Sequence, residues 1–430
     1  MNLLHANDRP GHYPASFYAA TATPFAPQPP LQGDAQTDVA IIGAGFTGLS
    51  AALHLAQKGF RVTMLEAHRV GFGASGRNGG QVGTGQRLDQ ATLEIMLGRD
   101  KAHQLWDIGA EAKALVKSLI QNHQIPVTFY PGIAHPCRTA TEVRHSNDSA
   151  ELLARNYNYT DIAPLGRAEM AALIGSNTYL GGDIDRGAGH IHPLNYAIGI
   201  ATAAIKAGAR VHESSEVLRV DYGANITLHT AQGRVAAQHL ILACNGYLGA
   251  LEPKIAARVM PINSYMIATE PLAKPLIAAP VAVTDTKFVN NYWRMSEDGR
   301  LLFGGVETYG YRFPDVARAV RKPLLKVYPQ LKNTRIDYAW GGTLAITMNR
   351  LPCFARPQPN TLNASGYSGY GIAMASMAGK ILAEAIAGQA GRFDLMANLP
   401  QTPFPGGAAL RWPLLVLAMT WYGMRDRLGL

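Results

Sequence analysis

The feature that most constrains the fold is a glycine-rich turn between an apolar strand and a helix, in the run DVAIIGAGFTGLSAALHL that begins at Asp38. Gly43, Gly45 and Gly48 form the pattern GxGxxG, which alone is weak evidence because glycine turns are common. Here the pattern follows a strand, opens a helix and precedes Glu66 at the end of a second strand, where an acid can meet a ribose hydroxyl. This context predicts a Rossmann-type fold that binds a dinucleotide, either NAD or FAD.

Each glycine of this turn has a separate physical task. Gly43 allows the tight turn, Gly45 lets the backbone approach a pyrophosphate, and Gly48 lets the helix and the strand pack closely. The free N–H groups and the positive end of the helix then face the phosphates. The alternative interpretation is an ordinary strand-turn-helix unit in which Glu66 is a structural acid.

A second glycine-rich loop, GASGRNGGQ at residues 73–81, lies a few residues beyond Glu66 and has four glycines in nine positions. A simple nicotinamide-binding domain has no place for such a loop, whereas a flavin stretched across the sheet needs one. The loop therefore favours FAD over NAD. The alternative is a surface loop.

Composition and charge exclude several classes of protein. The 430 residues are 47% hydrophobic and only 16% charged, which fits a compact protein of two domains. The net charge of +9 comes from scattered Lys and Arg residues without a basic run, so no nucleic-acid partner is expected. Cys137, Cys244 and Cys353 are far apart and form no CxxC pair, so neither a disulfide framework nor a metal site is predicted.

The two ends of the chain bear on its location. The N-terminus lacks a basic segment followed by an apolar core, so no signal peptide is expected and the predicted location is cytoplasmic. The apolar stretch 413–424 is too short to span a bilayer, so no transmembrane span is expected. That stretch is interpreted as a buried helix, with peripheral membrane contact as the alternative.

The pattern of elements predicts an α/β protein with two domains. An irregular, proline-rich arm occupies residues 1–35. A discontinuous Rossmann-type FAD/NAD(P)-binding domain, built on a doubly wound sheet, is expected over 36–95, 184–260 and 336–430. A substrate domain with an antiparallel sheet is expected over 96–183 and 261–335. Helices are expected over 93–124 and 142–175, and an apolar helix follows GYSGYG at 366–371.

Separate motifs resemble, in order, those of the D-amino-acid oxidase-like FAD-dependent oxidoreductases, and more closely the gamma-glutamylputrescine oxidoreductase group. The similarity runs over almost the whole chain. It is carried by DVAIIGAGFTGLSAALHL, EAHRVGFGASGRNGGQ, GHIHPLN, SYMIATEPL, GYSGYG and LPQTPFPGG.

The resemblance implies where FAD binds. Glu66 would bind the adenosine ribose, Arg69, Ala74 and Ser75 would follow the pyrophosphate and ribityl chain, and residues 77–81 would lie beside the isoalloxazine. The loop would then be bare because the flat ring passes over its backbone, and its amides would donate to the edge of the ring. Val217 matches a position whose backbone contacts adenine, and Gly246 would be a second close approach. The complete expected set is Gly43, Gly45, Phe46, Thr47, Gly48, Glu66, Ala67, Arg69, Ala74, Ser75, Arg77, Asn78, Gly79, Gly80, Gln81, Val217, Gly246, Gly369, Tyr370, Gly371 and Ile372.

The motif GYSGYG brings a helix N-terminus toward the flavin. Gly369 and Gly371 precede the helix, and its positive end favours the anionic reduced ring if it points at the pyrimidine edge. The family often has histidine at the position of Tyr370, so cationic assistance from that residue is not expected here. Related sarcosine oxidases tether the flavin through a cysteine, but Leu344 stands at that position. We therefore expect noncovalent FAD.

Amine oxidation needs a neutral amine whose C–H bond faces the flavin, and it need not use a strong protein base. The predicted substrate-side residues are Tyr292, Trp293, Arg294 and Tyr370, with Trp340 beside them; the aromatic rings suit a carbon stem and Arg294 a carboxylate. The alternative for the segment YWR is an amphipathic strand with a surface arginine. His190 and His192 are expected to be structural.

The resemblance implies oxidation of the primary amine of gamma-glutamylputrescine or a similar polyamine conjugate to an imine, which hydrolyses to an aldehyde. Oxygen or another electron acceptor would reoxidise the flavin, and oxygen would yield hydrogen peroxide. Three alternatives remain. One is an enzyme for secondary or alpha-amino acids such as pipecolate, sarcosine or proline, another is a dehydrogenase that passes electrons to a membrane quinone, and the third is a non-catalytic FAD-binding protein.

Overall fold

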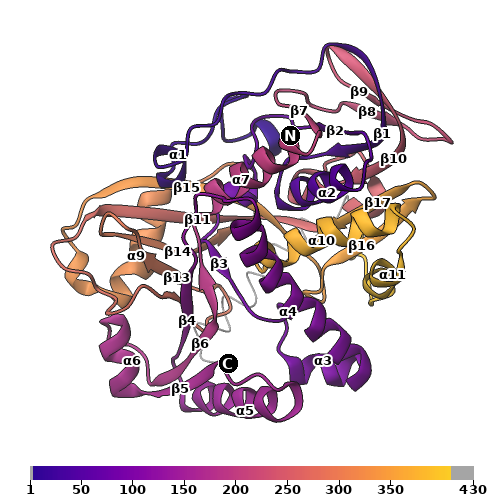
Figure 1. The fold of residues 1–430 in the computed structure, drawn as a ribbon. Helices are drawn as coiled ribbons and strands as arrows, with labels where there is room; N and C mark the ends of the chain where they lie inside the picture. The colour runs from indigo at the N-terminus through magenta and orange to yellow at the C-terminus, as the bar shows by residue number, and fades with distance from the viewer. Residues whose placement is uncertain (1–2, 408–430) are drawn as a thin grey trace.

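The structure, a computed structural model, describes residues 3–407, which fold around two β-sheets (Figure 1). In this part of the chain the first sheet has eight strands. Their order is β16 (Cys353–Gln358), β17 (Thr361–Ser365), β10 (Gly233–Leu242), β1 (Gly33–Ile42), β2 (Val62–Leu65) and β7 (Arg210–His212), with the hairpin of β8 (Arg219–Asp221) and β9 (Ile226–His229) attached to β10.

The centre of the first sheet is parallel and buried on both faces. Strands β7, β2, β1, β10 and β17 run parallel to their neighbours, while β16 and β9 are antiparallel additions. Along β1, Val39 and Ile41 belong to one hydrophobic core, and Ala40 and Ile42 belong to another. This alternation explains the continuous apolar run before Gly43, because successive side chains of a strand point to opposite faces.

Long helices cover one face of this sheet. They include α2 (Phe46–Gln57), α4 (Arg99–Asn122), α7 (Pro193–Lys206) and α10 (Gly371–Ile386), and α2 packs against both α7 and α10. Gly379 allows the close approach of α10, because a Cβ there would lie 2.3 Å from the carbonyl oxygen of Thr47. The opposite face packs against the β8–β9 hairpin and the short α8 (Pro253–Ala256), rather than against the long helices that a doubly wound sheet predicts.

The second sheet is mainly antiparallel. Nine strands of the described chain belong to it, in the order β15 (Ile336–Ile346), β11 (Met260–Pro271), β14 (Arg300–Thr308), β13 (Tyr292–Met295), β12 (Ala282–Thr284), β4 (Tyr130–Cys137), β6 (Gly181–His190) and β3 (Gln81–Val82), with β5 (Ile162–Gly166) attached to β6. Only the pairing of β12 with β4 is parallel among these described strands. Helix α9 (Val316–Val327) packs on β11, β14 and β15.

The remaining helices are short or peripheral. They are α1 (Phe17–Ala20), α3 (Gln90–Leu97), α5 (Ala140–Tyr157), α6 (Arg167–Ile174), α11 (Gly391–Ala397) and the 3-10 turns η1 (Leu3–His5), η2 (Ala74–Gly76), η3 (Asn245–Tyr247) and η4 (Pro329–Leu331). The stretch expected to be one helix over 93–124 is interrupted at Gly98, whose φ of +82° ends α3 before α4 begins. The stretch 142–175 contains β5 between α5 and α6.

Sheet membership differs from the domain ranges drawn from the sequence. Strands β6 and β15 lie in the second sheet, and helix α4 contributes to the core of the first domain. Each of these elements crosses or adjoins a predicted boundary. Strand pairing between distant segments decides their place, and local sequence patterns do not report such pairing.

The N-terminal arm is anchored across the first domain. Phe17 and Tyr18 of α1 are buried, and the hydroxyl of Tyr13 donates to the carbonyl of Val70 at 2.7 Å. Within residues 3–407, no helix is long and apolar enough to cross a membrane. The apolar stretch 413–424, expected to be a buried helix or a membrane contact, lies outside the described residues.

Candidate active site

One cavity of about 2000 Å³ lies where the carboxyl ends of β1, β2 and β10 meet the second sheet. This is the edge at which open α/β sheets bind ligands. Its volume exceeds the range of about 300–1000 Å³ that a single small ligand usually occupies. The cavity therefore has room for a large cofactor and a substrate together.

The first glycine turn lies at one end of this cavity. Gly43 has a φ of +102°, and a Cβ at Gly48 would lie 2.0 Å from the carbonyl oxygen of Gly43, so the turn and the start of α2 require glycine. No side chain caps α2 at Gly45, in contrast to α5, which Thr139 caps. The uncapped N-terminus of α2 faces the cavity and suits a phosphate.

Glu66 ends β2 at the cavity wall. Its carboxylate oxygens accept hydrogen bonds from the backbone N–H groups of Ala44 at 2.8 Å and His68 at 2.9 Å. Burial raises the pKa of Glu66 to about 7, while these backbone donors oppose the rise and the nearby Glu213 adds to it. Hydroxyl donors from a ribose would favour the ionised carboxylate, so this position fits the adenosine end of FAD.

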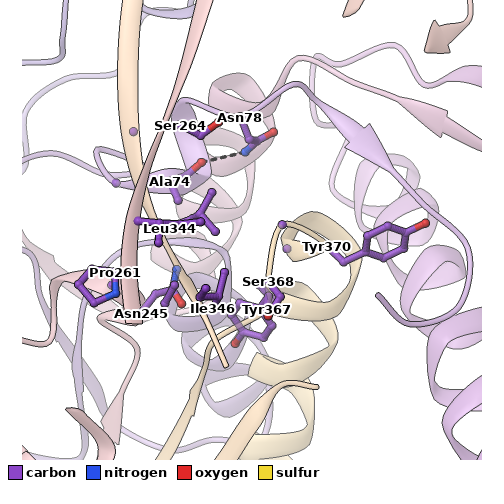
Figure 2. A pocket seen from close by; sticks show the side chains of 18 of the residues that line it. Ala74, Asn78, Asn245, Pro261, Ser264, Leu344, Ile346, Tyr367, Ser368 and Tyr370 are labelled. Atoms are coloured by element: carbon purple, nitrogen blue, oxygen red, sulfur yellow. Dashed lines mark hydrogen bonds between the residues drawn. The ribbon is translucent and has the colours of Figure 1, made fainter. Parts of the chain in front are cut away.

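The second glycine loop is braced by its own polar groups. The Asn78 amide nitrogen donates to the carbonyl oxygens of Ala74 and Ser75, both at 2.9 Å, and Figure 2 shows the bond to Ala74. The hydroxyl of Ser75 accepts the N–H of Phe46 at 3.0 Å, which joins this loop to the start of α2. A Cβ at Gly45 would lie 2.9 Å from that hydroxyl, so the two loops are in contact.

Protein atoms account for two of the glycines in this loop. A Cβ at Gly79 would lie 2.8 Å from the ring of Tyr292, and a Cβ at Gly80 would lie 2.2 Å from the carbonyl oxygen of Ile191. Gly80 also has a φ of +82°. The backbone is therefore bare at these two positions because side-chain and backbone atoms of the protein press against it, which is a different reason from the flat ring expected over the loop.

Arg77 lines the cavity but its guanidinium is held by the protein. It donates to the Phe72 carbonyl at 2.6 Å, to the Asp8 carboxylate at 2.8 Å and to the Gly341 carbonyl at 3.0 Å. One terminal nitrogen, Nη2, is buried without a hydrogen-bond partner in the described chain. Arg77 thus ties the loop to the N-terminal arm and to β15, with one buried donor left over.

The N-terminus of α10 also lies at the wall of the cavity. Gly369 has a φ of +92° with open space where a Cβ would stand, and Tyr370 occupies the N-cap without capping the helix through its side chain. Residues 369–372 all line the cavity. A flavin edge placed here would meet the positive end of the helix, which stabilises negative charge.

The ring of Tyr370 points away from the α10 axis, as Figure 2 shows. It packs on Gly83, where a Cβ would lie 2.6 Å from the tyrosine hydroxyl. Burial raises the pKa of Tyr370, with Arg87 opposing the rise. Its neutral ring separates the large cavity from a side cavity of about 220 Å³, because it lines both.

The predicted residues of strand β13 separate in the structure. Tyr292 lines the cavity, and its hydroxyl lies 3.1 Å from that of Ser264. Trp293 is only 1% exposed, outside the cavity lining, and its indole N–H donates to the hydroxyl of Tyr328 at 2.9 Å. Arg294 also lies outside the lining, and donates to the Gly79 carbonyl at 3.2 Å. Arg294 thus holds the backbone of the second glycine loop, residues 73–81, without lining the cavity itself.

Most other predicted cofactor residues line the cavity, including Val217 and Gly246, but Gly48, Arg69 and Gly80 do not. Arg69 forms an ion pair with Glu213 at 2.9 Å and donates to the Phe25 carbonyl of the arm. The remaining lining members of the predicted set are Gly43, Gly45, Phe46, Thr47, Glu66, Ala67, Ala74, Ser75, Arg77, Asn78, Gly79, Gln81, Gly369, Tyr370, Gly371 and Ile372.

Four lining residues on the substrate side were missed in the sequence, namely Arg87, Glu307, Tyr309 and Arg350. The available signal was the charge in VETYG, where Glu307 interrupts an apolar strand close to its end. Trp340, expected beside the substrate, instead donates to the backbone carbonyl of Arg77 at 3.0 Å.

Leu344 is the residue that the sequence analysis compared with the flavin-linking cysteine of the sarcosine oxidases. Leu344 lines the cavity at that position and is drawn in Figure 2. The three cysteines are free, and Cys353 is buried in the core behind the first sheet. Noncovalent binding of FAD therefore remains the expectation.

Comparisons with known proteins agree with this geometry. The family model described as FAD dependent oxidoreductase (DAO) matches residues 38–385. The chain is 40% identical to gamma-glutamylputrescine oxidoreductase of Escherichia coli, over 96% of this chain and 99% of that protein. It is also 40% identical to a probable oxidoreductase, OrdL, of Rhizobium meliloti, over 96% of this chain and 97% of that protein.

The fold is also shared with solved structures. Glycine oxidase from Geobacillus kaustophilus superposes with a TM-score of 0.72 at 20% identity, over 83% of this chain and 95% of that structure. The Rossmann-type domain joined to a largely antiparallel sheet, together with the match to the family model, identifies the class of protein as an FAD-dependent oxidoreductase. The chain belongs to the DAO family of FAD-dependent oxidoreductases.

Proposed function

We propose that this protein oxidises the primary amine of gamma-glutamylputrescine, or of a similar polyamine conjugate, to an imine. Water then converts the imine to an aldehyde and releases ammonia. The observation that carries the proposal is the 40% identity, over nearly the full length of both chains, to a relative named gamma-glutamylputrescine oxidoreductase. The cavity supports it, because there is room for a substrate beside the cofactor.

FAD, when bound, supplies the two-electron acceptor for this reaction. The chain's own part is to hold and orient both partners. The backbone of residues 73–81 and the α10 N-terminus would enclose the flavin, with the helix stabilising negative charge at its pyrimidine edge. No step requires a strong protein base once the amine is neutral.

An aromatic wall would hold the carbon stem of the substrate. Tyr292, Tyr309 and Tyr370 all line the cavity, and burial raises the pKa of each hydroxyl above its usual value. Neutral rings exclude water and pack on methylene groups. The faces of these rings also attract the protonated, positively charged form of the amine.

The test is anaerobic reduction of the flavin, followed at its visible absorbance band. The panel contains gamma-glutamylputrescine, putrescine, sarcosine, pipecolate and proline. We expect rapid bleaching by gamma-glutamylputrescine. Bleaching by the amino acids alone would overturn the proposal in favour of an amino-acid oxidase or dehydrogenase, and bleaching by none of them would support a non-catalytic protein.

The proposed electron acceptor is oxygen, which takes two electrons and two protons from the reduced flavin and forms hydrogen peroxide. We expect one peroxide for each aldehyde in air-saturated buffer. Absence of peroxide, together with sedimentation of the protein with lipid vesicles, would indicate a quinone-linked enzyme. The free cysteines fit the proposed cytoplasmic location, which cell fractionation would test.

A further inference from the structure

Three charged side chains on the substrate side of the cavity differ from the other charged groups that line it. Arg87 precedes α3, Glu307 is near the end of β14, and Arg350 follows β15. Among the residues that the structure describes, none accepts or donates a side-chain hydrogen bond or forms an ion pair with these three.

Other charged groups nearby already have partners. Asp183 lies 2.7 Å from the ring nitrogen of His135, and Asp285 accepts the hydroxyl of Tyr179 at 3.0 Å and the amide of Asn291 at 2.6 Å. Glu142 completes the capping box of α5. The unsatisfied charges are thus concentrated in the set of Arg87, Glu307 and Arg350, which we call the charged triad.

The three side chains of the charged triad interact electrostatically. Burial raises the pKa of Glu307, and Arg350 and Arg87 oppose that rise. Burial also lowers the pKa of Arg350, and repulsion from Arg87 lowers it further. Two guanidiniums and one carboxylate therefore share a partly dehydrated space, and a ligand with charges of both signs would relieve their lost solvation.

The charged triad lies close to the second glycine loop, residues 73–81, beside which the flavin is expected. In the second sheet, Glu307 pairs with Ser264, whose hydroxyl lies 3.1 Å from that of Tyr292, and the Tyr292 ring covers Gly79. Phe288 and Tyr309 also line this side, with the Arg350 guanidinium 5.9 Å from the centre of the Phe288 ring. A substrate that reaches the flavin past Tyr292 would come close to these charges.

The geometry points to a subsite for an alpha-amino-acid head group, whose carboxylate binds Arg87 and Arg350 and whose ammonium group binds Glu307. This inference rests on the proposed function and extends it to the nonreacting end of the substrate. Two guanidiniums suit a carboxylate, and a carboxylate accepts charge-assisted hydrogen bonds from an ammonium. Because both ligand charges stand on one carbon, the charged triad selects an amino acid conjugate of a diamine over the free diamine.

The first test compares Glu307→Gln and Arg350→Gln with the wild-type holoenzyme on gamma-glutamylputrescine and on putrescine. We expect KM for the conjugate to rise about tenfold or more in either variant, since each loses a charged hydrogen bond. KM and kcat for putrescine, which lacks the head group, should change less than about twofold. Arg234→Gln is the matched control, because Arg234 lies outside the cavity lining and forms an exposed ion pair with Asp34.

The second test measures binding without turnover. Gamma-glutamylbutylamide has the same head and stem but no terminal amine, and its binding to the holoenzyme can be followed by calorimetry. We expect binding to weaken at least about tenfold in Glu307→Gln and Arg350→Gln but not in Arg234→Gln. Retained FAD content and an unchanged Tm would show that the variants fold.

The outcomes separate this inference from the proposed function. Equal changes for the conjugate and for putrescine, or unchanged binding of gamma-glutamylbutylamide, would overturn the subsite. If no primary amine reduces the wild-type flavin but gamma-glutamylbutylamide still binds through the charged triad, the proposed function fails and the subsite stands. Larger losses for proline or sarcosine than for the conjugate would show that the charged triad binds the reacting amino acid instead, and would also overturn the inference.

Discussion

Two single residues, one in the cavity wall and one in the loop beside it, are held by unusual local environments. Glu66 is a buried acid that relies on two backbone donors, and Gly80 combines a left-handed backbone with a close contact to Ile191. The first environment should affect the affinity for FAD, and both should affect the free energy of unfolding.

Glu66 makes the affinity for FAD depend on pH. Its pKa of about 7 in the protein means that the carboxylate is mostly protonated at pH 5.5 and mostly ionised at pH 7.5. Ribose hydroxyls favour the ionised form, so FAD should bind about tenfold more tightly at pH 7.5 than at pH 5.5. Fluorescence titration of the cofactor-free protein measures this ratio. Glu66→Gln should bind FAD with little pH dependence, and an unchanged slope in that variant would contradict the assignment.

The raised pKa of Glu66 also determines how the free energy of unfolding of the cofactor-free protein changes with pH. Because the pKa of Glu66 is higher in the folded state than its usual value of 4.5, its protonated form stabilises the fold at low pH. This contribution is lost as pH rises from 4.5 through 7, by about 3 kcal/mol in the free energy of unfolding. The free energies of unfolding of wild type and Glu66→Gln, measured by urea titration, should depend differently on pH between 4.5 and 7. The same dependence in both proteins would contradict the raised pKa of Glu66.

Gly80 should be far less tolerant of alanine than a glycine with the same backbone in open space. Gly388, with a φ of +88° and no atom within 4 Å of a Cβ, is the matched control. We expect Gly388→Ala to cost about 1–2 kcal/mol of unfolding free energy from backbone strain alone. Gly80→Ala should cost at least about 1 kcal/mol more, because the Ile191 carbonyl must move. Equal losses in urea titrations would refute the packing argument.

At the scale of elements, loops and helix ends join the ends and edges of strands around the expected cofactor site. The turn after β1, the loop 73–81 and the start of α10 meet around one cavity, and the N-terminal arm joins them. Leu3 and Leu4 line that cavity, Asp8 pairs with Arg77 at 2.8 Å, and the backbone N–H of Gly11 donates to His68 at 3.1 Å.

Removal of residues 1–12 should therefore weaken FAD binding. We expect a loss of about tenfold or more, since the deletion exposes the cavity wall and leaves the buried Arg77 guanidinium without its carboxylate. The dissociation constant, measured by fluorescence quenching, tests this. Asp8→Asn should reproduce part of the loss, while Asp34→Asn, which breaks the exposed ion pair with Arg234, should not. Full affinity in the truncated protein would show that the arm has no role.

The elements that the sequence predicted best were those with a local signature. The strand, turn and helix around Gly43 and the helix after Gly371 are present, because apolar periodicity and glycine turns act over a few residues. The place of β15 in the second sheet and the break at Gly98 were not predicted, since tertiary pairing and a single cap decided them. Trp293 was grouped with Tyr292 although successive side chains of a strand point to opposite faces. Arg294 is two residues from Tyr292, but its guanidinium donates to the Gly79 carbonyl, a tertiary contact that the local sequence does not report.

For the whole molecule, the two sheets enclose a cavity to which segments from most of the described chain contribute. The charged triad shows why the substrate side was hard to predict, because its members come from three separate elements that only the tertiary fold brings together. The cofactor side was easier, since glycine turns after strands have a recognisable spacing and the flavin family shares them.

The most direct test of the central claim is the visible spectrum of the purified protein before and after acid precipitation. We expect a yellow protein with one FAD per chain, whose colour moves to the supernatant when acid unfolds the chain. A colourless protein that also fails to take up added FAD would contradict the claim that this cavity holds the cofactor, and colour retained in the pellet would contradict noncovalent binding.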